Sequence, residues 1–146
     1  PVRAQAAGVA ERTGAGPGAL WAVLDDEAPD SAPTLVREEL SRWVDADAAD
    51  RAAEARAWVE GQLARPQRAE DLAGDLLGGL LELPPDHLTL LVDALAAVEA
   101  SDSGAFDGQI ARALALFPVP QLLRLEETFT VARRRRSTAA GQDRGD

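Results

Sequence analysis

The sequence predicts an all-α fold, a single bundle of five to six helices with disordered ends. Three observations support this prediction. Leucine, valine and alanine recur at steps of three and four residues, the spacing of one face of an α-helix. Prolines at 66, 84, 85 and 118 divide these stretches, because a proline interrupts a helix or opens a new one. Hydrophobic residues make up 46% of the 146, enough for a core without disulfides.

The composition changes along the chain and predicts three parts. Residues 1–18 are rich in alanine and glycine, and we expect a flexible tether there. Residues 19–136 carry the apolar stripes and should form the helical bundle. Residues 137–146 are small and polar, and we expect a disordered tail.

The first half of the bundle should begin with one or two helical turns at 19–24, which end at the acidic residues that follow. Asp30 or Ser31 can cap the next helix. Its apolar stripe consists of Leu35, Val36, Leu40, Trp43 and Val44. Asp45, Asp47 and Asp50 mark a break or a new cap before another helix, which runs to about Arg65. The two segments could also form one long helix bent near Asp45.

Pro66 can open the next helix, whose stripe is wide enough to be buried on most sides. That stripe consists of Ala69, Leu72, Ala73, Leu76, Leu77, Leu80 and Leu83. Gly78 and Gly79 weaken this helix by about 1 kcal/mol each relative to alanine, so a close neighbouring helix would explain their presence. Pro84 then forces a turn. The following helix presents Leu88, Leu91, Val92, Leu95 and Val98 on one face.

The last two helices should follow a turn at 102–104 and be separated by Pro118. Their stripes consist of Phe106, Ile110, Leu114 and Phe117, and then of Leu122, Leu125 and Phe129. A shift of 34 residues superimposes leucines, one glycine and one proline of 66–100 on apolar, glycine and proline positions of 102–136. We therefore expect two similar helical hairpins packed on each other, in a closed bundle because a solenoid usually needs three units.

Charge and missing residue types restrict the function. The net charge is −10, with ten Arg and 23 acidic residues giving −13 over residues 1–132, and five Arg and two Asp giving +3 over 133–146. The acidic body argues against binding of duplex nucleic acid, which leaves the Arg tail as the candidate for such contacts. No Cys, Lys or Tyr is present, so common nucleophiles and soft metal ligands are missing. We expect no enzyme activity, no cofactor and no metal.

Several weaker motifs have ordinary structural explanations. The glycines of 14–18 follow no strand and precede no Gly-Lys-Ser motif, so a tether is favoured over a phosphate loop. Asp45, Asp47 and Asp50 resemble the start of a calcium loop, but the glycine and final glutamate of that loop are missing. His87 stands alone in a first helical turn, where a solvated or capping role is favoured.

The candidate partner-binding residues are Trp58, Leu125, Phe129, Arg133, Arg134, Arg135 and Arg136. Trp58 lies beside the line from Ala52 to Val59, so we expect it to be an exposed anchor, a role in which tryptophan is common. The four arginines have two interpretations. They either bind nucleic acid or an acidic partner, or they complement the dipole at the end of a helix.

Residues 76–136 also show a family resemblance, carried by these residues: Leu80-Leu81-Glu82-Leu83-Pro84 followed by Leu88, then Pro118, Leu122, Leu125, Glu127-Thr128-Phe129 and the Arg cluster. In this order they resemble the NarJ/TorD-like chaperones of molybdenum redox enzymes. The resemblance implies an all-α protein that binds a client peptide without catalysis. The chain departs from the family with Leu125 where Tyr is usual, and residues 1–65 have no counterpart in it.

Together these patterns predict a non-catalytic protein-interaction module, an adaptor or small subunit that binds a partner through an apolar helix face. Wide stripes on short helices exceed what a small bundle can bury, and the excess should form a groove or a dimer seam. The alternatives are a chaperone of the NarJ/TorD type and a nucleic-acid accessory protein that uses Arg133–Arg136. We expect a protein partner or a homo-oligomer, no membrane span and a cytoplasmic location. Because the sequence starts at Pro1 and lacks Met, we expect a processed piece.

Overall fold

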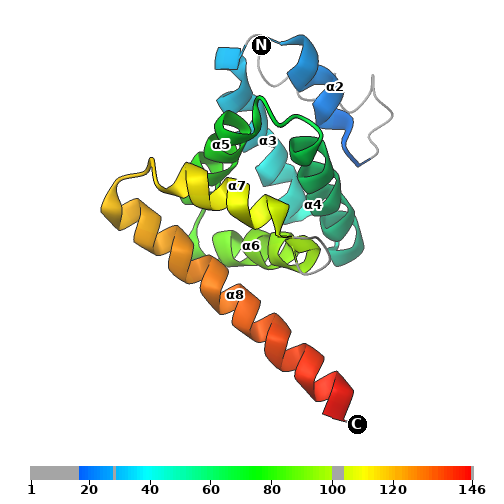
Figure 1. Cartoon of the computed structure of the whole chain (residues 1–146). Coiled ribbons are helices and arrows are strands. Elements are labelled where there is room, and N and C mark those ends of the chain that lie inside the picture. Colours follow the sequence, from blue (N-terminus) through cyan, green and yellow to red (C-terminus); the bar gives the residue numbers. More distant parts are fainter. Residues whose placement is uncertain (1–16, 28, 100–103, 146) are drawn as a thin grey trace.

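The computed structural model of the chain describes residues 17–27, 29–99 and 104–145, and within these ranges it contains α-helices and no strand (Figure 1). This confirms the all-α prediction. Seven α-helices are present in the described ranges, against the five to six expected. They are α2 (Ala19–Asp26), α3 (Ala32–Asp45), α4 (Ala48–Leu63), α5 (Ala69–Leu81), α6 (Pro85–Glu99), α7 (Ala105–Leu114) and α8 (Val119–Gly145), with a 3-10 turn at Pro29–Ser31.

The break near Asp45 produces two helices, and this accounts for part of the difference. Asp47 is the N-cap of α4, and its carboxylate accepts a hydrogen bond from the Asp50 backbone N–H at 2.8 Å. This bond satisfies one of the free amide groups at the start of the helix. On the other side of the break, at the C-terminal end of α3, Arg51 donates hydrogen bonds to the carbonyl oxygens of Trp43 and Val44. The alternative of one long bent helix is therefore wrong.

Helices two apart in the sequence are the principal packing partners. The most extensive contacts join α3 to α5, α4 to α6, α5 to α7 and α6 to α8. The chain is thus a series of three hairpins, α3–α4, α5–α6 and α7–α8, each packed on the next. Helix α4 also contacts α7, so the first and third hairpins share a core. That contact agrees with a closed bundle in preference to an open solenoid.

The core is built mainly from leucine, and α5 is its most completely buried helix. Every residue of the α5 stripe predicted from the sequence is buried except Leu83, which is half-buried. Gly79 lies where α5 approaches α3, and a Cβ at this position would stand 2.8 Å from Leu40 Cδ1. The expected close helix approach is therefore confirmed at Gly79. At Gly78 an added Cβ would have no neighbouring atom within 4 Å.

Helix α2 packs against the C-terminal half of α4 through Trp21. The Trp21 indole N–H donates to the Ala57 carbonyl oxygen at 3.0 Å, and its ring lies 4.7 Å from the Trp58 ring. Gly61 gives this ring its space, because a Cβ there would stand 2.0 Å from Trp21 Nε1. Arg65 covers the outer side of the Trp21 ring, with 4.4 Å between its guanidinium carbon and the ring centroid.

Arg65 also joins α4 to the end of α2 through Asp25. Its guanidinium donates to both carboxylate oxygens of Asp25, at 2.8 and 2.6 Å. This hydrogen bond is the main reason that the pKa of Asp25 lies below its usual value. Because the pair is partly exposed to solvent, we expect it to stabilise the fold by less than about 1 kcal/mol.

A buried polar chain links the first hairpin to the third. The Trp58 indole N–H donates to Gln62 Oε1 at 3.0 Å, and the Gln62 amide donates to Gln109 Oε1 at 2.8 Å. Gln62 is fully buried, and Gln109 nearly so. Amide groups removed from water are costly unless they are hydrogen-bonded, so this chain satisfies groups that would otherwise destabilise the core.

The C-terminal end differs from the prediction of a disordered tail over 137–146. Helix α8 continues through Gly145 and projects beyond the other helices (Figure 1). Extension of an existing helix adds one hydrogen bond per residue, and alanine, glutamine and arginine in this segment favour it. The predicted tether at 1–18 falls largely outside the described residues, which begin at Pro17. Among the described helices, none is long and apolar enough to cross a membrane.

Candidate functional site

Exposed apolar side chains gather at the start of α8 and in the turn before it. Leu116 is 73% exposed, Val119 66% and Leu123 56%, and Val131 lies further along the same helix at 37%. Val119 and Leu123 are four residues apart and therefore share one side of α8. Glu127, Thr130 and Arg134 continue this side at helical spacing. The solvent-facing side formed by Val119, Leu123, Glu127, Thr130 and Arg134 is called the outer ridge of α8 below.

A groove of about 380 Å³ runs beside the outer ridge, between α7 and α8. Ile110, Leu114, Leu122 and Phe129 are its apolar lining residues, and Ala111 and Ala115 add small side chains. Polar side chains complete it, namely Asp107, Glu126, Thr130 and Arg133. The groove therefore combines an apolar lining with four polar side chains, three of them charged, and protein interfaces likewise have an apolar centre and a polar rim.

The 34-residue repeat explains where this groove comes from. Four groove positions correspond to buried positions of the preceding hairpin. Asp107, Ala111, Glu126 and Thr130 stand 34 residues after Ala73, Leu77, Val92 and Ala96, all of which are buried. The second hairpin is covered by the third, since α5 packs on α7 and α6 on α8. No further described hairpin covers the third, and so the matching face remains open.

The arginine run divides into two kinds of residue. Arg133 donates to Asp107 of α7 at 2.6 Å and lies over the Phe129 ring. Arg135 donates to Asp93 of α6 at 3.0 Å. Both therefore hold α8 against its neighbours. Arg134 and Arg136 are exposed.

Trp58, Leu125 and Phe129 are located in the core. Trp58 is 2% exposed, and Leu125 and Phe129 are equally well buried. The prediction that Trp58 is an exposed anchor is therefore wrong. The ring lies beside its own helix stripe, as the sequence indicates, but α2 covers it there through Trp21. Leu125 faces the helices that α8 packs against. The exposed positions of α8 lie outside the stripe formed by Leu122, Leu125 and Phe129.

The stripes predicted from the sequence do not include Leu116, Val119 or Leu123. The predicted stripe for the last helix contains Leu122, Leu125 and Phe129, and the structure leaves the first of these half-buried and buries the other two. Val119 and Leu123 lie off that stripe. The stripe of Leu122, Leu125 and Phe129 already provides the buried face of the helix. Further apolar residues outside that stripe were therefore the signal in the sequence for a second, exposed apolar face.

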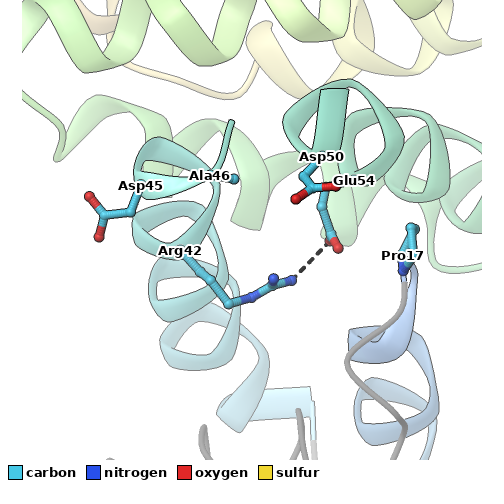
Figure 2. Close-up of a pocket in the computed structure, with 6 residues that line it drawn as sticks. All are labelled: Pro17, Arg42, Asp45, Ala46, Asp50 and Glu54. Carbon is cyan, nitrogen blue, oxygen red and sulfur yellow. Dashed lines mark ion pairs between the residues drawn. The ribbon is translucent and has the colours of Figure 1, made fainter. Parts of the chain in front are cut away.

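A second candidate is an acidic pocket of about 340 Å³ between α3 and α4 (Figure 2). Figure 2 shows Arg42 and Glu54 pointing toward each other, with an ion pair of 3.0 Å between them. Arg42 also donates to Glu39, which accepts a further bond from the Trp43 indole N–H at 3.2 Å. The remaining lining residues are Pro17, Asp45, Ala46 and Asp50.

Two buried carboxylates therefore converge on one guanidinium, the arrangement that catalysis by acidic residues would require. Burial raises the pKa of Glu54, Arg42 opposes the rise, and Glu39 adds to it. Arg42 lies between the two acids and joins α3 to α4, so a role in helix pairing accounts for all three side chains. Among the described residues no group of three or more His, Asp or Glu side chains is placed to hold a metal ion.

Asp47 and Asp50, considered above as calcium ligands, form the N-terminal cap of α4 instead. His87 lies half-buried in the first turn of α6. The resemblance to NarJ/TorD-like chaperones stays a prediction. Comparison of the chain with protein-family models, with curated proteins and with solved structures found no match.

Proposed function

We propose that this protein is a non-catalytic interaction module that binds a protein partner through the α7–α8 face, which comprises the outer ridge of α8 and the adjoining groove. The observation that carries the proposal is the cluster of Leu116, Val119 and Leu123, each more than half exposed, beside a groove lined by buried and half-buried apolar residues. Single exposed leucines are ordinary on protein surfaces, whereas a contiguous apolar patch beside a groove is typical of a binding face.

Burial of the α7–α8 face against another polypeptide would be favourable in free energy. Removal of apolar surface from water contributes about 25 cal/mol per Å², so burial of three large side chains supplies several kcal/mol toward binding. We expect the polar residues at the groove, Glu126 among them, to orient the partner and contribute specificity.

Site-specific photocrosslinking in the source cells tests the proposal. A photoreactive residue at position 123 should crosslink to protein, and the same residue at exposed Arg56 on α4 should give at most about one tenth of that yield. A second variant, V119E with L116E, should abolish the crosslink from position 123 because a carboxylate opposes burial. Since both side chains are exposed, the thermal unfolding midpoint should stay unchanged. Equal yields from positions 123 and 56 contradict the proposal.

A further inference from the structure

We infer that the partner on the outer ridge of α8 is a second copy of this chain, with the two α8 helices antiparallel. This inference rests on the proposed function and specifies its partner. It is carried by the order of side chains along the ridge, by their exposure, and by the length of α8 beyond the rest of the fold.

The outer ridge has a self-complementary sequence. From its start it presents the apolar side chains of Val119 and Leu123, then acidic Glu127, then Thr130, and finally basic Arg134. All of these are exposed except Thr130, which is half-buried. They recur at three- and four-residue steps, so one helix facing this side meets all of them.

An antiparallel arrangement pairs opposite charges twice. With the two-fold axis between positions 130 and 131, Glu127 of each copy faces Arg134 of the other, and Leu123 faces Thr138. A parallel arrangement would instead place Glu127 against Glu127 and Arg134 against Arg134, which is unfavourable. The charge pattern therefore specifies direction as well as attraction.

The projecting end of α8 gives a second argument. The helix has 27 residues and is about 40 Å long. Arg135 donates to Asp93 of α6, and the helix continues from there to Gly145, with its C-terminal end projecting beyond the other helices (Figure 1). The segment after Arg135 is only a short part of α8, and isolated helices of fewer than about 12–15 residues are marginal in water, because most helix stability comes from packing on an apolar face. The N-terminal half of a second α8, with its exposed leucine and valine, supplies such a face.

Sedimentation equilibrium of the full chain measures the association directly. The chain has a mass of 15.4 kDa, so the dimer has twice that mass. We expect a reversible monomer–dimer equilibrium at micromolar concentrations that weakens as salt is raised, because salt screens exposed charge pairs. A chain that stays monomeric up to about 1 mM, a concentration at which even weak specific contacts form, overturns the inference.

Charge reversal tests the antiparallel arrangement. E127R and R134E should each raise the dimer dissociation constant about tenfold or more, because each places like charges together twice. The double variant E127R/R134E should return it to within about threefold of the wild-type value, since the pairs reform with reversed sign. Positions 127 and 134 are about 10.5 Å apart along one helix, so recovery requires two chains. E70R, an equal charge change at an exposed site on α5, is the control and should leave the constant unchanged.

The outcomes separate this inference from the proposed function. A single variant that fails to weaken the dimer, or a double variant that fails to recover, overturns the antiparallel pairing of α8. If the chain is monomeric and position 123 still crosslinks in a position-dependent way to a different protein, the second copy is wrong and the interaction module stands. If position 123 yields no crosslink and the chain is monomeric, both are wrong.

Discussion

The second and third hairpins are related by a shift of 34 residues, yet only the second is covered on both sides. Positions that face their own neighbours keep their apolar character, as in Leu91 and Leu125, which are both fully buried. Positions on the opposite face change. Buried Val92 of α6 corresponds to exposed Glu126 of α8, and buried Leu77 of α5 to exposed Ala111 of α7.

The difference shows that the residue types tolerated at a position depend on whether a neighbouring hairpin covers it, and not on the helical pattern alone. A terminal unit in a helical array needs a more polar outer side, because no next unit removes that side from water. The third hairpin meets this need only in part. It carries two acids, two alanines and a threonine in its groove, but it keeps Leu122 there as well and exposes Val119 and Leu123 nearby.

The largest expected effect comes from exchanging one pair of corresponding residues. Val92→Glu places a carboxylate at a fully buried site without a partner, and we expect a loss of about 4 kcal/mol or more in the free energy of unfolding. The reverse exchange, Glu126→Val, affects an exposed site and should change that free energy by less than about 0.5 kcal/mol. Urea unfolding followed by tryptophan fluorescence measures both. Similar losses for the two variants would show that the hairpins are covered alike.

A smaller effect is expected at Gly79, whose counterpart in the third hairpin is Ala113. Gly79→Ala sets a Cβ 2.8 Å from Leu40 Cδ1, and we expect it to destabilise the fold by about 1–3 kcal/mol. The neighbouring Gly78→Ala meets no atom within 4 Å and should stabilise the helix by about 0.5–1 kcal/mol. Opposite signs in denaturant unfolding would confirm the close approach of α3 and α5. Stabilisation by both substitutions would contradict it.

The third prediction concerns Asp75, whose counterpart is the buried Gln109. Burial raises the pKa of Asp75 from 3.8 to about 6, with a further contribution from Asp71 and partial opposition from Arg68. The folded state therefore binds this proton more tightly than the unfolded state does. The resulting stability is fully present below the unfolded pKa and is lost as the pH rises through about 6.

Asp75→Gln imitates Gln109 and removes this titration. At pH 7 we expect the variant to be more stable than the wild type by about 1–2 kcal/mol, a range reduced for the partial solvent access of the side chain. The gain in stability should become smaller as the pH is lowered from 7 and should disappear near pH 4. Guanidinium unfolding of both proteins across this range measures it. A gain that does not depend on pH would exclude Asp75 as the titrating group.

The smallest effect is expected at Asp107, whose counterpart is Ala73. Asp107→Ala removes the ion pair with Arg133, whose two side chains are largely exposed. We expect a loss of less than about 1 kcal/mol, and less again in high salt. Thermal unfolding at two salt concentrations is the measurement. A loss of several kcal/mol would mean that this pair, and not apolar packing, holds α7 to α8.

The sequence predicted the all-α fold class and most helix boundaries well, because both depend on local features of the chain. Prolines set the starts of α6 and α8, and Asp47 capped α4 as a break near Asp45 implied. The burial of α5 also followed from its stripe. Trp58 was mispredicted because Trp21 of α2 covers its ring, and the spacing of residues along α4 carries no information about that contact. The last turns of α8 were mispredicted because polar composition alone indicated disorder.

The exposed apolar surface was predicted to exist, but its position was not predicted. An excess of apolar surface over what the bundle can hide was expected, and it is present at Leu116, Val119 and Leu123. Which leucine of a rich helix faces outward depends on where the neighbouring helices lie. In α8 that choice separates buried Leu125 from exposed Leu123, two residues apart, and the packing of α8 against α6, with smaller contacts to α5 and α7, decides it.

The buried amide pair of Gln62 and Gln109 has a consequence for alignment. Leucine surfaces permit neighbouring helices to slide, because one leucine contacts another almost equally well at several offsets. An amide donor needs its acceptor at one place, and a slip of one turn, about 5.4 Å, would leave both groups without partners at about 1–3 kcal/mol each. The pair thus selects a single offset between α4 and α7, and with it the alignment of the first hairpin against the third.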